Sequence, residues 1–161
     1  MPTPVSETII ADVTAAIEGV TVQAGYHHTL RWVGRFNRHV AERPEVGPGD
    51  LRPCVLLKYV GDTGGEPGQY RIRGTARIIA QALIDYDDDA IGGPDVQLNT
   101  LGVDLVRAVT EMGLDEKEYF FSGWDTTSLH DIDSEEPEDG VLVTLDFRYV
   151  VNAESIGSLI A

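Results

Sequence analysis

The chain has 161 residues, and its 12 Lys and Arg against 27 Asp and Glu give a formal net charge of −15. This length is typical of one domain, and so negative a charge argues against general affinity for DNA, RNA or anionic membranes, whose phosphates would repel it. The single cysteine, Cys54, excludes an internal disulfide bond and a cysteine-based zinc site. With neither an amino-terminal leader pattern nor a run of about 18 apolar residues, the sequence predicts a protein made in the cytoplasm without a membrane-embedded segment.

The first third of the chain predicts one helix and then two strands. Ser6 is a suitable helix cap, and the apolar residues after it recur at spacings of three and four, which predicts an amphipathic helix over 6–19. Apolar and polar residues alternate over 26–36, as in a half-buried strand with a basic outer face. The nearly continuous apolar run 54–60 predicts a central strand in which Cys54 is a buried structural residue.

The middle of the chain predicts a hairpin and a second helix. The glycine-rich segment 61–68 favours a flexible hairpin loop without regular structure. Alternate residues over 70–84 are apolar or small, which predicts a long strand, although 76–84 is equally compatible with a helix. After an acidic turn, Asp95 can cap a helix that ends at Gly113. The apolar face of this helix comprises Leu98, Leu101, Leu105, Ala108 and Met112.

The last part predicts two strands, 119–131 and 141–151, joined by an acidic turn. We therefore expect an α+β fold, mainly an antiparallel sheet of four to five strands packed against two helices. Residues 1–161 form a single domain in this prediction. Residues 153–161 are expected to be either a flexible tail or a tail that docks on a partner.

The sequence holds no motif for catalysis or for a cofactor. His27 and His28 would point to opposite sides of a strand and could not bind one metal ion, so they are expected to be ordinary polar strand residues. The glycine-rich loop lacks the Lys-Ser/Thr pair of a phosphate-binding loop, and the acidic clusters do not match the EF-hand spacing. We expect no enzyme activity, no cofactor and no metal site, while weak divalent binding by the acidic turns stays open.

The charge is polarised along the chain. Residues 1–110 carry 10 basic and 14 acidic side chains, whereas residues 111–161 carry 2 and 13, giving −4 and −11. The segment 31–77 is locally basic, with nine basic and five acidic residues. Oppositely charged regions can attract a second copy or another partner, although solvated surface charge is the simpler interpretation. The candidate interface residues are Arg31, Arg35, Arg71, Arg73, Asp131, Asp133, Glu135 and Glu136.

The order of these segments resembles the tail terminator proteins of long-tailed bacteriophages, also called tail completion or minor tail U-like proteins. The resemblance spans roughly residues 6–152 and is a pattern of lengths and apolar positions. The segments that carry it, after the first helix and the alternating strand, are RPCVLLKYV, YRIRGTARIIAQALI, an acidic turn with IGG, VQLNTLGVDLVRAVTEM and VLVTLDFRYVV.

The resemblance implies a subunit of a ring, commonly a hexamer, that caps the head-proximal end of the tail tube in the virion. Such a ring assembles in the host cytoplasm, ends polymerisation of the tail tube protein and presents its other face to the head connector or stopper protein. DNA would pass through the lumen without specific binding, helped if acidic side chains line it. The family carries no catalytic residues. The alternatives are another neck component, such as a head completion or stopper protein, and a small α+β ligand-binding domain.

Overall fold

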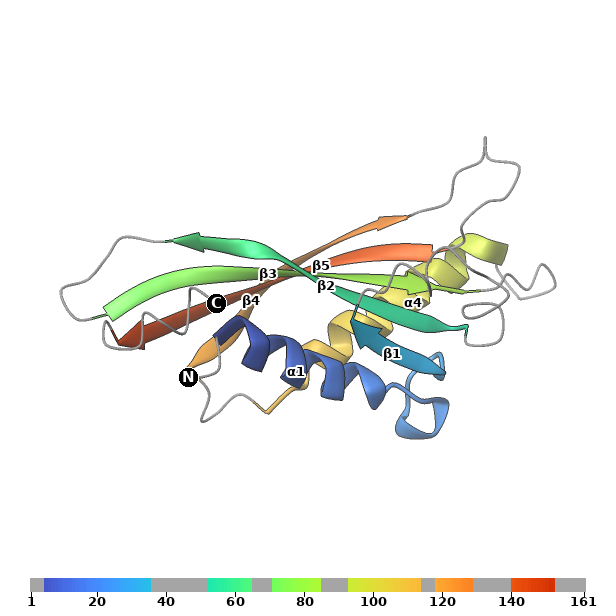
Figure 1. Ribbon diagram of the computed structural model, residues 1–161. Helices are drawn as coiled ribbons and strands as arrows, with labels where there is room; N and C mark the ends of the chain where they lie inside the picture. The colour runs from blue at the N-terminus through green and yellow to red at the C-terminus, as the bar shows by residue number, and fades with distance from the viewer. Residues whose placement is uncertain are drawn as a thin grey trace.

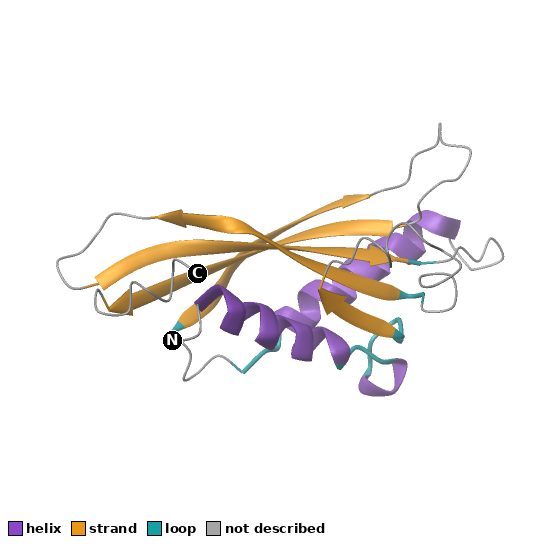
Figure 2. Cartoon of the chain, viewed as in Figure 1, coloured by secondary structure: helices purple, strands orange, loops and turns teal. Residues whose placement is uncertain are grey.

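The computed structural model describes residues 5–35, 52–64, 71–84, 93–113, 118–128 and 140–152. In these residues one face of a five-stranded sheet is covered by two α-helices, which confirms the predicted α+β class (Figures 1 and 2). None of the described helices is long and apolar enough to cross a membrane. In chain order the elements are α1 (Val5–Glu18), a 3₁₀ turn η1 (Val22–Ala24), β1 (Trp32–Arg35), β2 (Cys54–Gly64), β3 (Arg71–Leu83), α4 (Gly93–Thr110), β4 (Tyr119–Ser128) and β5 (Gly140–Asn152).

The sheet has the strand order β1-β2-β3-β5-β4, so β1 and β4 form its two edges. β1 runs parallel to β2, and all other neighbouring strands are antiparallel. The register places four residues in one line across the sheet: Trp32, Cys54, Leu83 and Gly140. We call this the Trp32 end of the sheet. The opposite end, where Arg71 pairs with Asn152, is the Arg71 end.

The core lies between the sheet and the helices. Alternate residues of β3 and β5 face α1 and α4, and β3 contributes small side chains that let the helices approach. The buried residues of these four elements include Ile9, Val13 and Ile17 of α1, Leu101 and Leu105 of α4, Ala76, Ile78 and Ala80 of β3, and Val143, Leu145 and Phe147 of β5. Cys54 is fully buried, as predicted, and packs with Leu56 and Leu83 in a separate small cluster.

Three expectations about secondary structure need correction. The predicted strand over 26–36 is a strand only at Trp32–Arg35 within the described residues, because the backbone before it bonds elsewhere, for example from Leu30 N to Val20 O at 3.1 Å. Residues 61–64 of the expected glycine loop belong to β2, which accommodates them through a bulge between Tyr59 and Gly61. The second helix begins at Gly93 rather than at a cap formed by Asp95.

The remaining ambiguity over 76–84 is resolved in favour of a strand as far as Leu83. Every residue from Arg71 to Leu83 pairs with β5, and most also pair with β2. A segment between two strands satisfies its backbone groups on both sides, and this outweighs the helix propensity of its alanines. Part of the expected loop, the acidic turns and the tail at 153–161 lie outside the described residues.

Candidate functional site

The most strongly connected polar group in the described structure is the carboxylate of Asp104 on α4. Asp104 is fully buried, and each of its two oxygens serves one of two consecutive histidines. Oδ1 accepts from His27 N at 3.1 Å and lies 2.8 Å from His27 Nδ1. Oδ2 accepts from His28 N at 2.9 Å and lies 3.0 Å from His28 Nδ1. One carboxylate therefore holds two backbone amides and two imidazoles.

The same helix face makes further contacts with this loop. Arg107 Nη1 donates to Gly25 O at 2.8 Å, and its guanidinium lies 4.6 Å from the centre of the Tyr26 ring. Glu111 accepts from Arg107 Nε at 2.9 Å and from the Tyr26 hydroxyl at 3.1 Å. We call this set of contacts the α4 clamp, formed by Asp104, Arg107 and Glu111 against residues 25–28. The spacing of three places Asp104 and Arg107 on one face of α4, and Glu111, the residue after the helix, continues this face because its backbone N donates to Arg107 O at 2.9 Å.

The α4 clamp shows that the expected strand placement of His27 and His28 is wrong. Residues 26–30 are not in a strand, so His27 and His28 do not lie on opposite sides of one, and both reach the same carboxylate. No group of three or more potential metal ligands comes together in the described part of the chain. The clamp thus orients two imidazoles and fixes the backbone that leads into β1.

Electrostatics favour the ionised form of Asp104. Burial alone raises the pKa of this carboxyl, but the hydrogen bonds from the side chains and backbone of His27 and His28 outweigh it, and the net pKa is lowered. A charged side chain on an apolar helix face needs such partners. The sequence therefore contained one sign of this site, because Asp104 is a charged residue between Leu101 and Ala108 on the predicted apolar face.

Acid should weaken the clamp. A carboxyl whose pKa is lowered in the folded state contributes stability above its ordinary pKa of 3.8, and this contribution is lost as the pH falls through the lower folded value. We expect the free energy of unfolding to fall more steeply below about pH 4 in the wild type than in Asp104→Asn. The difference between the two slopes should correspond to the uptake of up to about one proton on unfolding. Urea titrations across this range measure the difference, and parallel curves would contradict it.

The candidate interface arginines do not form one patch. Arg31 and Arg35 are exposed at β1, near the Trp32 end, and Arg35 Nη1 is paired with Glu7 Oε2 at 2.6 Å. Arg71 and Arg73 are at the Arg71 end of β3. Ten residues separate Arg73 from Leu83, which is about 33 Å of strand. Asp131, Asp133, Glu135 and Glu136 lie outside the described residues, in the segment that connects β4 to β5.

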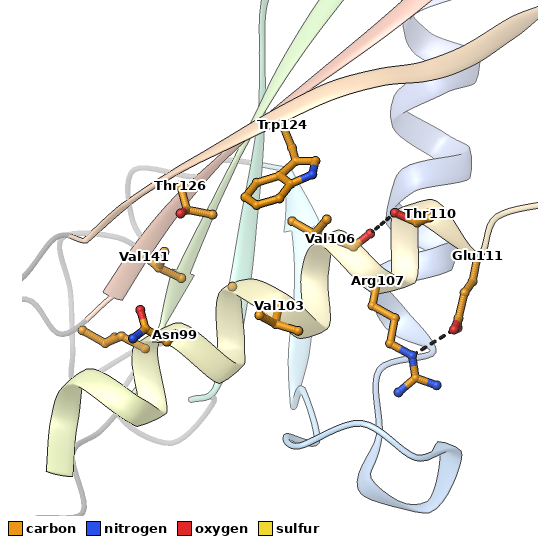
Figure 3. A pocket seen from close by; sticks show the side chains of 11 residues that line it. Asn99, Val103, Val106, Arg107, Thr110, Glu111, Trp124, Thr126 and Val141 are labelled. Atoms are coloured by element: carbon orange, nitrogen blue, oxygen red, sulfur yellow. Dashed lines mark hydrogen bonds and ion pairs between the residues drawn. The ribbon is translucent and has the colours of Figure 1, made fainter. Parts of the chain in front are cut away.

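A groove between α4 and β4, which the sequence did not indicate, is the second notable feature (Figure 3). Its volume is about 480 Å³, within the range of about 300 to 1,000 Å³ that is usual for ligand sites. The Trp124 ring extends from the edge strand over the helix, and Trp124 and Val103 are 57% and 56% exposed. The lining residues are Leu98, Asn99, Gly102, Val103, Val106, Arg107, Thr110, Glu111, Trp124, Thr126 and Val141.

Comparisons with known proteins add little. No family model and no curated protein matches the chain. Among solved structures, the chain is similar to the type 4 fimbrial biogenesis protein PilO from Pseudomonas aeruginosa, with 7% identity, a TM-score of 0.35, and coverage of 92% of this chain and 72% of that one. A likeness at this level carries no argument about function.

Proposed function

We propose that the chain is a structural subunit of a phage tail terminator. In this proposal, copies assemble head-to-tail into a hexameric ring that caps the tail tube at its head-proximal end, ends polymerisation of the tube and docks the head connector. The protein would be a virion component without enzyme activity or cofactor. Support comes from the order of segments in the sequence and from the placement of charge in the fold.

The observation that carries the proposal is that the basic residue Arg31 lies beside one edge strand of the sheet, while an acidic segment of the sequence follows the other edge strand. Arg31 immediately precedes β1, one of the two edge strands. The next residue, Trp32, belongs to the register line that defines the Trp32 end of the sheet. The acidic segment 129–139 joins β4 to β5, and Ser128 and Gly140 on either side of it lie at the same Trp32 end. β4 is the other edge strand.

This placement suits a ring. A contact between two different surfaces of the same subunit is heterologous, and it closes a ring when the rotation between neighbours allows. A second copy placed beside the first would bring Arg31 of one subunit next to the end of β4 of the other, from which the acidic segment continues. Complementary charge then sets register and disfavours other alignments. The α4 clamp contributes by fixing the backbone that leads to Arg31.

Arg71 and Arg73 fit a different role in this model. They begin β3 at the Arg71 end, where β2 and β3 continue beyond the end of α1 (Figure 1). Arg73 lies about 33 Å along the strands from the Trp32 end, where the ring contact is proposed. We assign this end of the sheet to an axial partner, either the tail tube protein or the connector.

The first experiment measures the mass and shape of the purified chain by light scattering and negative-stain electron microscopy. Rings with the mass of six subunits are expected, at low salt or on the end of a tail tube. A species that stays monomeric or dimeric in both conditions contradicts the ring and favours the ligand-binding alternative. Rings that bind the connector but not tube ends would instead indicate another neck component.

Reversing the charge at the β1 edge should weaken assembly. We expect Arg31→Glu to reduce self-association about tenfold at low salt, because it places like charges at the contact, with a smaller effect at high salt. The double reversal Glu135→Lys and Glu136→Lys should do the same, and combining all three changes should restore association. Sedimentation at several salt concentrations measures this.

The matched control is Arg148→Glu, which makes the same charge change at an exposed residue of β5, a strand that is not at an edge, seven residues along the strand from Val141 at the Trp32 end. It should associate like the wild type. If Arg31→Glu also associates like the wild type, or if the combined variant is no better than either parent, the electrostatic contact does not exist.

A further inference from the structure

One face of the sheet is turned away from both α-helices (Figure 1), and we call it the outer face. Phe147 and Tyr149 of β5 are buried on the helix side, so Arg148 and Val150, which alternate with them, point to the outer face. The direct strand partners of these two residues point the same way. Together they form what we call the outer patch, which comprises Arg73 of β3, Phe120 of β4, and Arg148 and Val150 of β5, all of them exposed.

The two arginines of the outer patch have no counter-ion among the described residues. Arg77, a third arginine of the outer face, pairs with Asp146 through two contacts of 2.8 and 3.1 Å. The ion pairs within the described part of the chain include neither Arg73 nor Arg148. Arg148 lies opposite Thr75, so it is diagonal to Arg73 at about 7 Å, and like charges at this separation repel each other. A chain with 27 acidic residues thus leaves two neighbouring cations without a carboxylate.

Apolar side chains lie directly beside these two charges. Phe120 is 51% exposed and is the strand partner of Arg148, while Val150 is 37% exposed and is the partner of Arg73. Aromatic residues and arginine are the types enriched in protein–protein interfaces, whereas lysine is depleted there. The guanidinium group also matches a carboxylate through two parallel hydrogen bonds. The outer patch therefore has the composition of a surface that binds carboxylates together with apolar side chains.

Charge and spacing favour an acidic protein segment over a nucleic acid. Nucleic-acid affinity comes from many phosphate contacts, whereas the outer patch offers two unpaired cations on a chain of net charge −15. Alternate side chains of an extended segment are about 7 Å apart, which is the separation expected for Arg73 and Arg148. Two acidic residues at alternate positions of such a segment would therefore reach one arginine each.

We propose that the outer patch docks an extended acidic segment of the tail tube protein. Two carboxylates of that segment pair with Arg73 and Arg148, and an apolar side chain covers Phe120 and Val150. This inference deepens the proposed function and rests on it for the identity of the partner, because ending polymerisation requires a direct contact with the tube. The contact is separate from the ring contact, which is proposed at the Trp32 end of the sheet.

Carbodiimide cross-linking locates this contact directly. The reagent joins an amine to a carboxylate that touches it, and a guanidinium does not react. The full-length Arg148→Lys variant keeps the positive charge and adds an amine to the outer patch. It is mixed with purified tail tube protein encoded in the same genome, and the products are mapped by mass spectrometry. We expect a link from position 148 to an Asp or Glu of the tube protein, and the absence of such a link overturns the proposal.

Arg77→Lys is the matched control for the cross-link. The carboxylate of Asp146 already occupies the side chain at position 77, so the introduced amine should couple to Asp146 within the chain. This internal product shows that the reagent works on the outer face. A link from position 77 to the tube protein at the same yield as from position 148 would show that coupling there is not specific to the outer patch, and would overturn the proposal.

Removing one charge from the outer patch should weaken binding of the tube protein about tenfold at low salt, because one charge-assisted hydrogen-bonded pair is lost. Arg148→Gln makes this change. Thr127→Glu also lowers the net charge by one, at an exposed residue of the outer face near the Trp32 end, where it pairs with Leu142. It should change the affinity by less than about twofold. Equal weakening by both variants in biolayer interferometry would show a response to net charge alone and would overturn the docking surface.

Three further outcomes separate this inference from the proposed function. If the double variant Arg73→Gln and Arg148→Gln caps tubes like the wild type, the outer patch is not the tube contact, while the terminator proposal stands. If the cross-link from position 148 goes to purified connector protein instead, the choice of partner is wrong. If the wild type binds single-stranded DNA, Arg148→Gln loses this binding and no tube protein is linked, the outer patch is a nucleic-acid site and the proposal is overturned.

Discussion

Replacement of Asp104 by alanine is expected to lower the free energy of unfolding by about 3 kcal/mol. The change leaves the amides of His27 and His28 without their acceptors and removes both contacts to the imidazoles. Each backbone donor left unpaired at a partly buried position costs about 1 to 3 kcal/mol. Urea unfolding followed by circular dichroism measures the loss. For a domain of this size, such a loss is a large fraction of total stability.

Two variants separate the clamp from a general effect of losing an aspartate. Asp104→Asn keeps one acceptor oxygen and should lose less stability than Asp104→Ala. Asp125→Ala removes an exposed carboxylate from β4 and should change stability by no more than about 0.5 kcal/mol. If Asp104→Ala is as stable as Asp125→Ala, the carboxylate does not hold residues 25–28 in the way described.

Replacement of Gly74 by valine is expected to cost about 2 to 3 kcal/mol, because Tyr149 occupies the space above this glycine. The two residues are direct partners on β3 and β5. A Cβ atom at Gly74 would lie 2.3 Å from Tyr149 Oη and 2.4 Å from its Cζ. The ring is buried at this position, and burial with the nearby Asp62 carboxylate raises the pKa of Tyr149 to about 12. A displaced ring would lose this environment.

Gly64 provides the matched control for Gly74. It pairs directly with Gly74 on β2, but a Cβ atom there meets nothing within 4 Å. Gly64→Val should therefore be nearly neutral in thermal unfolding. In the Gly74→Val background, Tyr149→Ala should cost less than it does in the wild type, because removing the ring also relieves its clash with the valine. Equal destabilisation by valine at both glycines would show that the effect is general to the strand and independent of Tyr149.

The elements that the sequence predicted well are those whose partners impose a simple period. The stripe of α1 at Ile10, Val13 and Ile17, and the alternation of β5 from Val141 to Tyr149, both follow burial on one face. Residues 26–30 have the same alternation but form no strand, because their backbone bonds to Asp104, 77 positions from His27. A contact at that separation leaves no local pattern.

The candidate sites divide in a similar way. Asp104 on an apolar helix face was a visible anomaly, although its two histidine partners were not visible. The groove depends on Trp124 being on an edge strand beside α4, and strand order is set by the whole sheet. The basic segment 31–77 looked continuous along the sequence, but the hairpin of β2 and β3 carries Arg73 to the far end of the sheet from Arg31.

The most direct test of the proposed function is the length of tail tubes assembled in the presence of the chain. Purified tail tube protein encoded in the same genome as the chain is allowed to polymerise with and without it, and lengths are measured by electron microscopy. We predict short tubes of bounded length, each with a ring at one end, and unrestricted growth with Arg31→Glu at low salt. Tubes that grow to the same lengths whether or not the chain is present, with no ring at either end, would contradict a tail terminator.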